Sequence, residues 1–330
     1  MRAAVCRSYG PPETVEVADV PAPALGPGQV RVRIDAAAVN FPDVLLVADR
    51  YQMTVPTPFV PGSEFAGLVT AVASDLPEGA EVAAGDRVAG ATLVGAFAEE
   101  VVVGADAVRR IPDGVDLRHA AAFGVAHRTA YHVRRSVAGL QAGDELVVLG
   151  AGGGVGLAAV QLGVLLGARV TAVASSADKL AAAAAHGAAQ GIDHRSVELR
   201  PALRELLPGG ADVVVDPVGG DLSEPALRSL RWGGRFVTVG FASGTIPRIP
   251  LNLVLLKGAR VLGFQFRDFV AHAPDEFARN EAELDGLLAS GRVVPHIGVT
   301  FPLDETPAAL RYVAEGRAIG KVVIDVIPAP

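Results

Sequence analysis

A glycine-rich turn between a short apolar strand and a helix is the feature that most constrains the fold of this chain. The run Gly150–Gly156 follows the apolar segment Glu145–Leu149 and precedes an uncharged segment of helical pattern. The spacing Ala151-x-Gly153-x-x-Gly156 is a dinucleotide-binding fingerprint with alanine in the first place. Gly153 lets the backbone approach a pyrophosphate, and Gly156 lets the helix pack close against the strand. A tight turn that binds no nucleotide is the alternative, which the strand–turn–helix context disfavours.

Strand and helix patterns alternate through the middle of the chain. Strands are predicted at 145–149, 169–174, 191–193, 211–216, 234–240 and 259–263, and helices at 120–135, 155–166, 177–186, 197–206 and 222–230. Regular alternation of this kind predicts an α/β fold with a doubly wound parallel Rossmann sheet.

The chain length predicts two domains, because 330 residues are about twice the length of a typical domain. The first third is β-rich, with alternating runs such as Val30–Ile34 between proline and glycine turns. A terminal strand is predicted at Gly320–Val326 and is expected to rejoin this first domain. We therefore expect residues 1–118 with 265–330 to form one domain and residues 119–264 to form the Rossmann domain.

The charge and the cysteine content exclude several classes of protein. The net charge of −7 argues against a nucleic-acid partner, which needs a basic face. The single cysteine, Cys6, forms no intramolecular disulfide and lies in a predicted buried strand. The uncharged run 146–168 is as long as a membrane helix, but the five glycines of 150–156 divide it, so no membrane partner is expected. No secretory leader pattern is found, which predicts a cytoplasmic location.

The segment after the second strand of the series indicates which dinucleotide binds. An NAD site places Asp or Glu there to bond the ribose hydroxyls, but the strand ends Ala174-Ser175-Ser176 without an acid. Ser175 and Lys179 are suited to meet a 2′-phosphate with a hydroxyl and a cation. Ser175-x-x-Asp178 is also a capping-box pattern for the next helix, and the two roles are compatible. The sequence therefore predicts NADPH.

Further motifs follow one another along the whole chain. They are Asn40-Phe41-Pro42-Asp43, Pro61-Gly62-Ser63-Glu64-Phe65-Ala66-Gly67, Gly85-Asp86-Arg87-Val88, Thr129-Ala130-Tyr131-His132, Asp216-Pro217-Val218-Gly219-Gly220, Gly240-Phe241-Ala242-Ser243-Gly244 and Gly320-Lys321-Val322-Val323. With the glycine turn and Ser175-x-x-x-Lys179, they make the chain resemble the zinc-free NADPH:quinone oxidoreductases (zeta-crystallin-like) of the medium-chain dehydrogenase/reductase superfamily. The resemblance implies that the β-rich domain is a GroES-like catalytic domain.

The resemblance also bears on metal binding. Zinc alcohol dehydrogenases of this superfamily carry Cys where Asn40 stands and His where Ser63 stands, and they have a four-cysteine lobe for a structural zinc. A single cysteine builds neither thiolate site. His127 and His132 are five residues apart, a spacing that indicates solvated or packed helix faces rather than metal ligands. We expect no zinc and no other metal.

The resemblance implies a cofactor contact for each matching position. The implied contacts are Asn40, Phe41, Pro42, Asp43 and Thr129 near the nicotinamide; Gly153, Gly154 and Val155 at the pyrophosphate; Ser175 and Lys179 at the 2′-phosphate; and Val218, Phe241, Ala242, Ser243, Phe264, Gln265, Phe266 and Lys321 around the rest of the site. Two positions depart from the family pattern. His194 stands where members have a tyrosine near the 2′-phosphate, and it is expected to serve the phosphate there. Leu45 stands where some quinone reductases have a tyrosine facing the substrate, while Tyr51 matches a second one.

We predict reduction of quinones or conjugated enones by hydride transfer from NADPH, without metal. Negative charge then develops on the substrate oxygen, and Asn40, Tyr51 and Thr129 are the candidate donors to it. An enoyl-thioester or alkenal reductase is the alternative within this fold, with a CoA phosphate bound by Arg267 or Arg248. A non-catalytic NADPH-binding protein, crystallin-like or a scaffold, is the alternative of a different class.

A homodimer is the expected oligomer. The run Arg260–Phe264 resembles the sheet edge through which members of the family pair their nucleotide domains. An exposed apolar edge strand has to be covered, and a second copy of the chain would cover it.

Overall fold

The computed structural model describes residues 1–79 and 81–327, and the chain divides into two compact units. The first unit is Met1–Val125 with Val294–Pro330, and the second is Ala126–Val293. Compared with the expected domains, residues 119–125 fall in the first unit and residues 265–293 in the second. The physical reason for the latter is a buried hydrogen-bond network, described below, that joins these residues to His132. These units are defined by compactness, so the expected boundaries of the functional domains remain a prediction.

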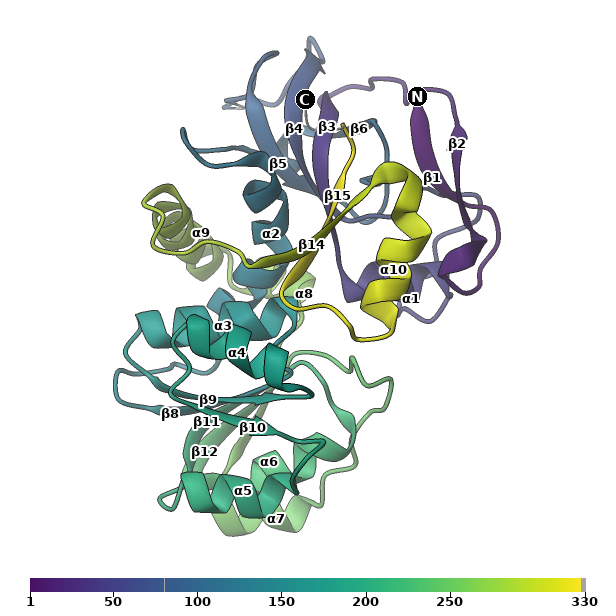
Figure 1. Ribbon diagram of the computed structural model, residues 1–330. Coiled ribbons are helices and arrows are strands. Elements are labelled where there is room, and N and C mark those ends of the chain that lie inside the picture. The colour runs from purple at the N-terminus through teal and green to yellow at the C-terminus, as the bar shows by residue number, and fades with distance from the viewer. Residues whose placement is uncertain (80, 328–330) are drawn as a thin grey trace. The chain divides into compact units, whose positions relative to one another are not determined.

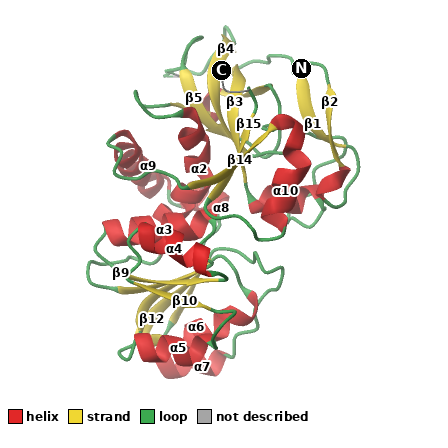
Figure 2. Ribbon diagram, viewed as in Figure 1, coloured by secondary structure: helices red, strands yellow, loops and turns green. Residues whose placement is uncertain are grey.

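The second unit contains a parallel sheet with helices on both faces (Figures 1 and 2). Its elements are β8 (Glu145–Leu149), α3 (Gly154–Leu165), β9 (Arg169–Ala174), α4 (Ala177–Ala185), β10 (Gln190–Asp193), α5 (Leu199–Leu206), β11 (Ala211–Asp216), α6 (Ser223–Arg228), β12 (Leu230–Thr238), α7 (Leu251–Lys257), β13 (Arg260–Gly263), α8 (Phe266–His272) and α9 (Pro274–Ala289). Over the described residues the sheet has six strands, in the order β10-β9-β8-β11-β12-β13, and all pairs are parallel. Helices α3 and α4 cover one face, and α5, α6 and α7 cover the other. The predicted doubly wound α/β fold is confirmed.

The strand order places the glycine turn where a ligand is expected to bind. The chain runs outward from β8 through β9 to β10 on one side, and through β11, β12 and β13 on the other. The crevice at the carboxyl ends of such diverging strands is where ligands of open α/β sheets bind. All six residues of β11 are buried, as expected for a strand covered by helices on both faces.

Most predicted elements of this unit are found with small shifts at their ends. The helix predicted at 222–230 is shorter, because a 3-10 turn (Gly220–Leu222) precedes α6, which ends at Arg228. The helix predicted at 120–135 is α2 (Leu117–His132), which continues into a π-helical turn (Val133–Val137).

The first unit is β-rich, as predicted, with α1 and α10 packed together at one side of its sheet (Figure 1). Its elements are β1 (Arg2–Cys6), β2 (Val15–Asp19), β3 (Gln29–Val39), α1 (Phe41–Val47), β4 (Glu64–Val72), β5 (Arg87–Ala91), β6 (Glu100–Gly104), β7 (Val108–Arg110), β14 (Ile297–Pro302), α10 (Thr306–Ala314) and β15 (Lys321–Asp325), with 3-10 turns at Pro12–Thr14, Ala105–Ala107 and Leu303–Glu305. The main sheet has the order β14-β15-β3-β4-β5-β7, and β6 also pairs with β3. Strand β15 pairs antiparallel with β3, which confirms that the C-terminal strand rejoins this unit. Cys6 is fully buried in β1, as expected.

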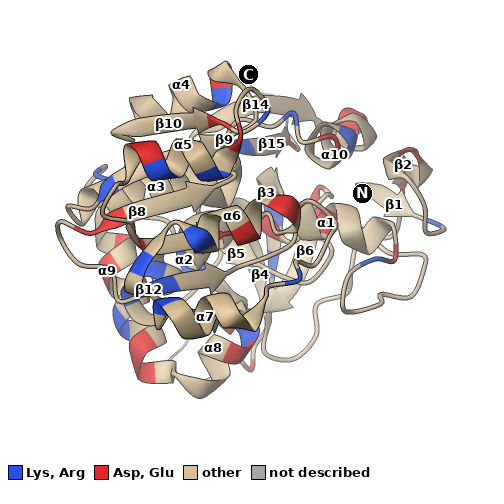
Figure 3. Cartoon of the chain, turned by 90° about the horizontal axis from the view of Figure 1, so that it is seen from below, with Lys and Arg blue, Asp and Glu red and all other residues tan. Residues whose placement is uncertain are grey.

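Charged residues are spread over both units. Figure 3 shows basic and acidic positions intermixed along the ribbon. Several form ion pairs, such as Arg118 with Asp325 at 2.6 Å and Arg235 with Asp144 at 2.8 Å. Within residues 1–79 and 81–327, no helix is long and apolar enough to cross a membrane.

Candidate functional site

The glycine turn connects β8 to α3, and its close packing accounts for its sequence. A Cβ on Gly156 would lie 2.7 Å from the carbonyl carbon of Gly150 and 2.8 Å from the Cα of Ala151, so no side chain fits there. A Cβ on Gly153 would meet only the Gly150 carbonyl oxygen, at 3.5 Å, among the described atoms. Gly153 therefore borders open space at the start of α3, where backbone N–H groups and the helix dipole favour an anion. A pyrophosphate fits this cradle.

Lys179 lies against the glycine turn. A Cβ on Gly152 would come within 2.5 Å of the Cβ and Cγ atoms of Lys179, so the lysine stem occupies the space above this glycine. The ammonium of Lys179 donates to the Ser175 hydroxyl at 3.2 Å. The structure thus brings together the glycine turn, Ser175 and Lys179, as expected.

The capping interpretation of Ser175 is wrong. The N-cap of α4 is Ser176, whose hydroxyl accepts from the backbone N–H of Lys179 at 3.4 Å. Ser175 is one residue too early for this bond, so its hydroxyl remains on the side of the Lys179 ammonium.

Three basic side chains interact at this edge of the second unit. Burial, and then the positive charge of Arg195, lower the pKa of Lys179. Burial first, then the charge of Arg195 and, more weakly, that of Lys179 lower the pKa of His194. Like charges this close repel one another, so a bound phosphate would stabilise all three. These residues fit a 2′-phosphate.

The loop after β11 is held by a buried carboxylate that the sequence reasoning did not single out. Asp216 accepts from the N–H groups of Val218 and Gly219, each at 2.8 Å, and from the Ser223 hydroxyl at 2.6 Å. Val218 in turn borders the glycine turn, since a Cβ on Gly150 would lie 2.6 Å from its Cγ2. This loop could have been recognised in the sequence by the acidic residue at the end of a predicted parallel strand, which Pro-Val-Gly-Gly follows.

The segment Phe241–Ser243 packs on this loop. The N–H of Ala242 donates to the Pro217 carbonyl at 3.1 Å, and the N–H of Ser243 donates to the Val218 carbonyl at 2.9 Å. The structure therefore brings Val218, Phe241, Ala242 and Ser243 together, as the resemblance implied.

His132 is fully buried, which selects the packed rather than the solvated one of the two expected environments. The Nδ2 amide of Asn280 lies 3.0 Å from its Nδ1, and the Oε1 of Glu281 lies 3.0 Å from its Nε2. An amide nitrogen only donates, so Nδ1 accepts and Nε2 carries the proton that Glu281 accepts. The Nε of Arg128 lies 2.7 Å from the other Glu281 oxygen. His127 is also buried, with its ring nitrogen 3.1 Å from Gln161.

Four phenylalanines surround the His132 ring. Their ring centroids lie 4.9 to 6.3 Å from that of His132, and they are Phe264, Phe266, Phe269 and Phe277. Gln265 caps α8 by accepting from the N–H of Asp268 at 2.6 Å. The expected cofactor segment Phe264–Phe266 is therefore fixed by packing on His132 and by this cap.

The first unit contains a separate buried polar cluster at the start of α1. The Lys321 ammonium donates to Asn40 Oδ1 at 2.6 Å and to Glu64 Oε2 at 3.1 Å. The Asn40 amide donates to the same Glu64 oxygen at 3.1 Å and lies 3.4 Å from the Ser63 hydroxyl. The other Glu64 oxygen accepts from the N–H of Val125 at 2.7 Å. The structure brings Asn40 and Lys321 together, and sequence reasoning missed that Glu64 joins them.

Asp43 lies at the third position of α1 and accepts from the Asn40 N–H at 2.7 Å. Asp43 is therefore the N3 residue of a capping box at the start of this helix. Burial raises its pKa from 3.8 to about 7, against the lowering effects of the Asn40 N–H, the Ser63 hydroxyl and the Lys321 charge.

Asp43→Asn is expected to gain stability relative to the wild type as pH rises. The folded protein holds the Asp43 proton up to about pH 7, whereas the unfolded chain releases it near 3.8, so this contribution to stability is lost as pH rises through about 7. Between about pH 5 and about pH 7 the loss amounts to about 3 kcal/mol for a fully buried carboxyl. Melting temperatures of both proteins between about pH 5 and about pH 8 measure it, with the exposed Asp19→Asn as a control. A difference in Tm that does not change with pH would contradict the assignment.

The other expected residues lie on α1, on α2, on α3 and in the segment after α1. Phe41 and Pro42 form the start of α1, Gly154 and Val155 form the first turn of α3, and Thr129 is half-buried on α2. Tyr51 is half-buried against the apolar core of the first unit, and Leu45 is half-buried on α1.

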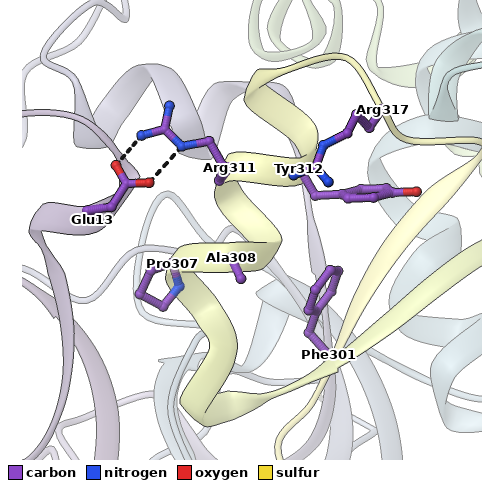
Figure 4. A pocket seen from close by; sticks show the side chains of 7 residues that line it. All are labelled: Glu13, Phe301, Pro307, Ala308, Arg311, Tyr312 and Arg317. Atoms are coloured by element: carbon purple, nitrogen blue, oxygen red, sulfur yellow. Dashed lines mark hydrogen bonds and ion pairs between the residues drawn. The ribbon is translucent and has the colours of Figure 1, made fainter.

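A surface hollow on the first unit contains none of the expected site residues. It is lined by α10, β14 and the turn before β2, with Tyr312 and Phe301 edge to face at 5.8 Å (Figure 4). Its arginines have partners, Arg311 with Glu13 and Arg317 with Glu315. The hollow therefore has no part in the function proposed below.

Comparison with known proteins identifies the family. Residues 26–113 match the family described as "Alcohol dehydrogenase GroES-like domain", and residues 154–283 match "Zinc-binding dehydrogenase". The chain is 35% identical to "Quinone oxidoreductase-like protein 2" of Bos taurus, covering 98% of this chain and 92% of that protein. It is 33% identical to "Quinone oxidoreductase" of Pseudomonas aeruginosa, covering 96% and 97%.

Solved structures agree with this relationship. The structure of Escherichia coli quinone oxidoreductase complexed with NADPH superposes with a TM-score of 0.89 at 26% identity, covering 99% of this chain and 100% of that one. The quinone oxidoreductase of Thermus thermophilus superposes with a TM-score of 0.82 at 31% identity, covering 99% and 100%.

The fold and the matched domains define a member of the medium-chain dehydrogenase/reductase superfamily. Within it, the chain belongs to the quinone oxidoreductase-like family and is an NAD(P)H-dependent oxidoreductase of that type. In the described part of the chain, no group of three or more His, Cys, Asp or Glu side chains is arranged to hold a metal ion.

Proposed function

We propose that this protein reduces quinones or conjugated enones with NADPH, without metal, in the cytoplasm. The observation that carries the proposal is the glycine turn at the diverging strands, with Lys179, His194 and Arg195 beside it. The turn suits a pyrophosphate, and the basic side chains suit a 2′-phosphate. The complexes of E. coli and T. thermophilus quinone oxidoreductases with NADPH support this choice of cofactor.

Each group of residues has one task in this proposal. NADPH, when bound, supplies a hydride to the acceptor. The glycine turn binds the pyrophosphate, Ser175 and Lys179 bind the 2′-phosphate, and the packing of Phe264–Phe266 on His132 fixes the shape of that side of the cofactor site. On the first unit, Asn40 and Tyr51 supply polar contacts for the acceptor, as does Thr129 on α2. The side chain at position 45, Leu45, makes the acceptor site more apolar than a tyrosine would.

Steady-state oxidation of NADPH and of NADH against a panel of acceptors tests the function. The panel contains 1,4-naphthoquinone, an alkenal and crotonyl-CoA. We expect turnover of the quinone or the alkenal with a preference for NADPH. Turnover of only the thioester would favour the enoyl-thioester alternative, and normal NADPH binding without any turnover would favour the non-catalytic one. Elemental analysis tests the expected absence of zinc.

Lys179→Met is expected to raise the Kd for NADPH by about 10-fold to 100-fold, because one charge-assisted contact to a phosphate is lost. The Kd for NADH is expected to stay within a factor of two or so, since NADH lacks the 2′-phosphate. Fluorescence titration measures both constants. Lys257→Met, on α7, is the matched control and should leave both unchanged. Equal weakening of both cofactors would place Lys179 elsewhere than at the 2′-phosphate.

We also propose a homodimer formed at the β13 edge of the second unit. The apolar side chains of Trp232, Leu251, Leu255 and Leu256 are 72% to 81% exposed, and Val261 on β13 is 48% exposed. Trp232 adjoins the end of α7, because a Cβ on Gly258 would lie 3.1 Å from its ring. An apolar patch of this kind beside an unpaired strand edge marks an interface.

Light scattering is expected to give a mass of twice 33.8 kDa. The double change Trp232→Glu with Leu255→Glu is expected to halve this mass, because charges at the interface repel and lose hydration. Leu93→Glu, an exposed apolar position of the first unit, serves as the control. A monomeric wild type would contradict the proposal.

A further inference from the structure

The Lys321 ammonium lies in the buried cluster of the first unit, with only 4% of its side chain exposed. It is at the first residue of β15, whose backbone N–H donates to the His296 carbonyl at 2.8 Å. Its side chain reaches Asn40 Oδ1 and Glu64 Oε2, at 2.6 and 3.1 Å. A buried cation of this kind has lost most of its hydration, so its remaining hydrogen-bonding capacity is strong.

One N–H of this ammonium has no acceptor among the residues that the structure describes. An ammonium has three donors, and the structure gives two acceptors to Lys321, on Asn40 and Glu64. A structural ion pair would be satisfied best by a third protein acceptor. The third N–H is therefore available to an oxygen that arrives with a ligand.

The side chains beside Lys321 are less able to donate a hydrogen bond to a ligand. The Asn40 amide hydrogens point to Glu64 Oε2 on one side and to the Ser63 hydroxyl and the Ala38 carbonyl on the other. Ser63 and Asn40 are the positions where zinc ligands stand in the zinc enzymes of this superfamily. The positive charge beside them in this chain is the Lys321 ammonium.

We propose that Lys321 is the catalytic residue that binds and protonates the acceptor oxygen, an inference that rests on the proposed function. When the acceptor carbon gains a hydride, the carbonyl π electrons move to its oxygen. That oxygen takes a proton from the Lys321 ammonium as the N–H bond breaks and an O–H bond forms. Lys321 is left as a neutral amine and regains a proton from solvent, so the acceptor gains one hydride and one proton in total.

Glu64 is the positioning residue of this arrangement. Its two oxygens join the Val125 backbone to Lys321 and Asn40, which keeps the ammonium at one place and charged. Glu64→Gln keeps the shape but removes the negative charge that holds the ammonium in place, so kcat of the folded protein is expected to fall with little change in KM. A purely structural role of Glu64 would lower Tm without changing kcat of the folded fraction.

The main test compares Lys321→Met with Lys321→Arg in the full-length protein, using two readouts. The first is the binding of 4-nitrophenol, whose phenolate absorbs at longer wavelength than the neutral phenol. Near pH 6, the wild type is expected to bind the phenolate, because the ammonium pairs with its oxygen. Lys321→Met is expected to bind it as the neutral phenol, and Lys321→Arg, which keeps the cation, to retain the phenolate spectrum. The same spectrum for wild type and Lys321→Met would overturn the proposal.

The second readout is turnover. Lys321→Met is expected to lower kcat, measured at saturating NADPH, by about 100-fold, since the lost contact acts on developing charge. Unchanged kcat would overturn the proposal. Lys257→Met is the control for loss of a lysine elsewhere, and the folded state of each variant is checked by Tm. A wild type that binds phenolate through Lys321 but reduces no acceptor would refute the proposed function and the protonation step, while leaving the anion site in place.

Discussion

Gly156→Ala is expected to abolish detectable NADPH binding and to lower the free energy of unfolding by about 3 kcal/mol. The added Cβ would overlap the backbone of Gly150 and Ala151, and these are backbone atoms that no rotamer change moves aside. Helix α3 would have to shift away from β8, which displaces the N–H groups that bind phosphate. Fluorescence titration with NADPH and chemical denaturation measure the two effects.

Gly153→Ala is the matched control in the same turn. Its φ of −85° suits alanine, and the new Cβ would meet only the Gly150 carbonyl oxygen, at an ordinary 3.5 Å. We expect the free energy of unfolding to stay within about 1 kcal/mol of the wild type. NADPH binding is still expected to weaken, because the methyl group occupies the space proposed for the pyrophosphate. Strong binding by either variant would contradict the placement of the cofactor on this turn.

Glu281→Ala is expected to lower the free energy of unfolding by at least about 3 kcal/mol. The side chain is 2% exposed, and its removal leaves the Nε2 proton of His132 and the charge of Arg128 without their buried partner. Thermal and chemical denaturation measure the loss. Because His132 packs on Phe264 and Phe266, we also expect weaker NADPH binding in the folded fraction.

Glu276→Ala, on the same helix, is the control. It distinguishes a loss of stability caused by breaking the buried network from one caused by any substitution on α9. Glu276 is 48% exposed and lies 3.8 Å from Arg279, and an exposed pair of this kind contributes less than about 1 kcal/mol. A loss of stability as large as that of Glu281→Ala would show that the helix, rather than the network, is what the substitution perturbs.

The sequence predicted the second unit well because its signals are local. Strands such as β8, β9 and β11 are short apolar runs between turns, and their predicted bounds match the structure. The cap of α4 was misassigned to Ser175 because Ser175 and Ser176 are both acceptable caps, and only the backbone geometry selects Ser176. Packing between distant segments, such as α9 on His132, has no local signal at all.

The cofactor side of the site was predicted more fully than its polar clusters. Glycine spacing and the residues after β9 are conspicuous in a linear sequence. The link between Glu64 and Lys321 joins residues 257 apart, and the link between His132 and Glu281 joins residues 149 apart. Such pairs are indistinguishable in the sequence from solvated charges, because burial is decided by the whole fold.

Because Lys179 packs on Gly152, the residue proposed to bind the 2′-phosphate also restricts which residues can evolve at position 152 of the glycine turn. The stem of Lys179 is what a side chain at position 152 would meet first. Descendants that lose the lysine in favour of a small residue would gain room at 152, and an alanine there would then prevent the lysine from returning. After both changes, a preference for NADH could not revert to one for NADPH by a single substitution at position 179. A double-mutant cycle of Gly152→Ala and Lys179→Ala measures the coupling between the two positions directly.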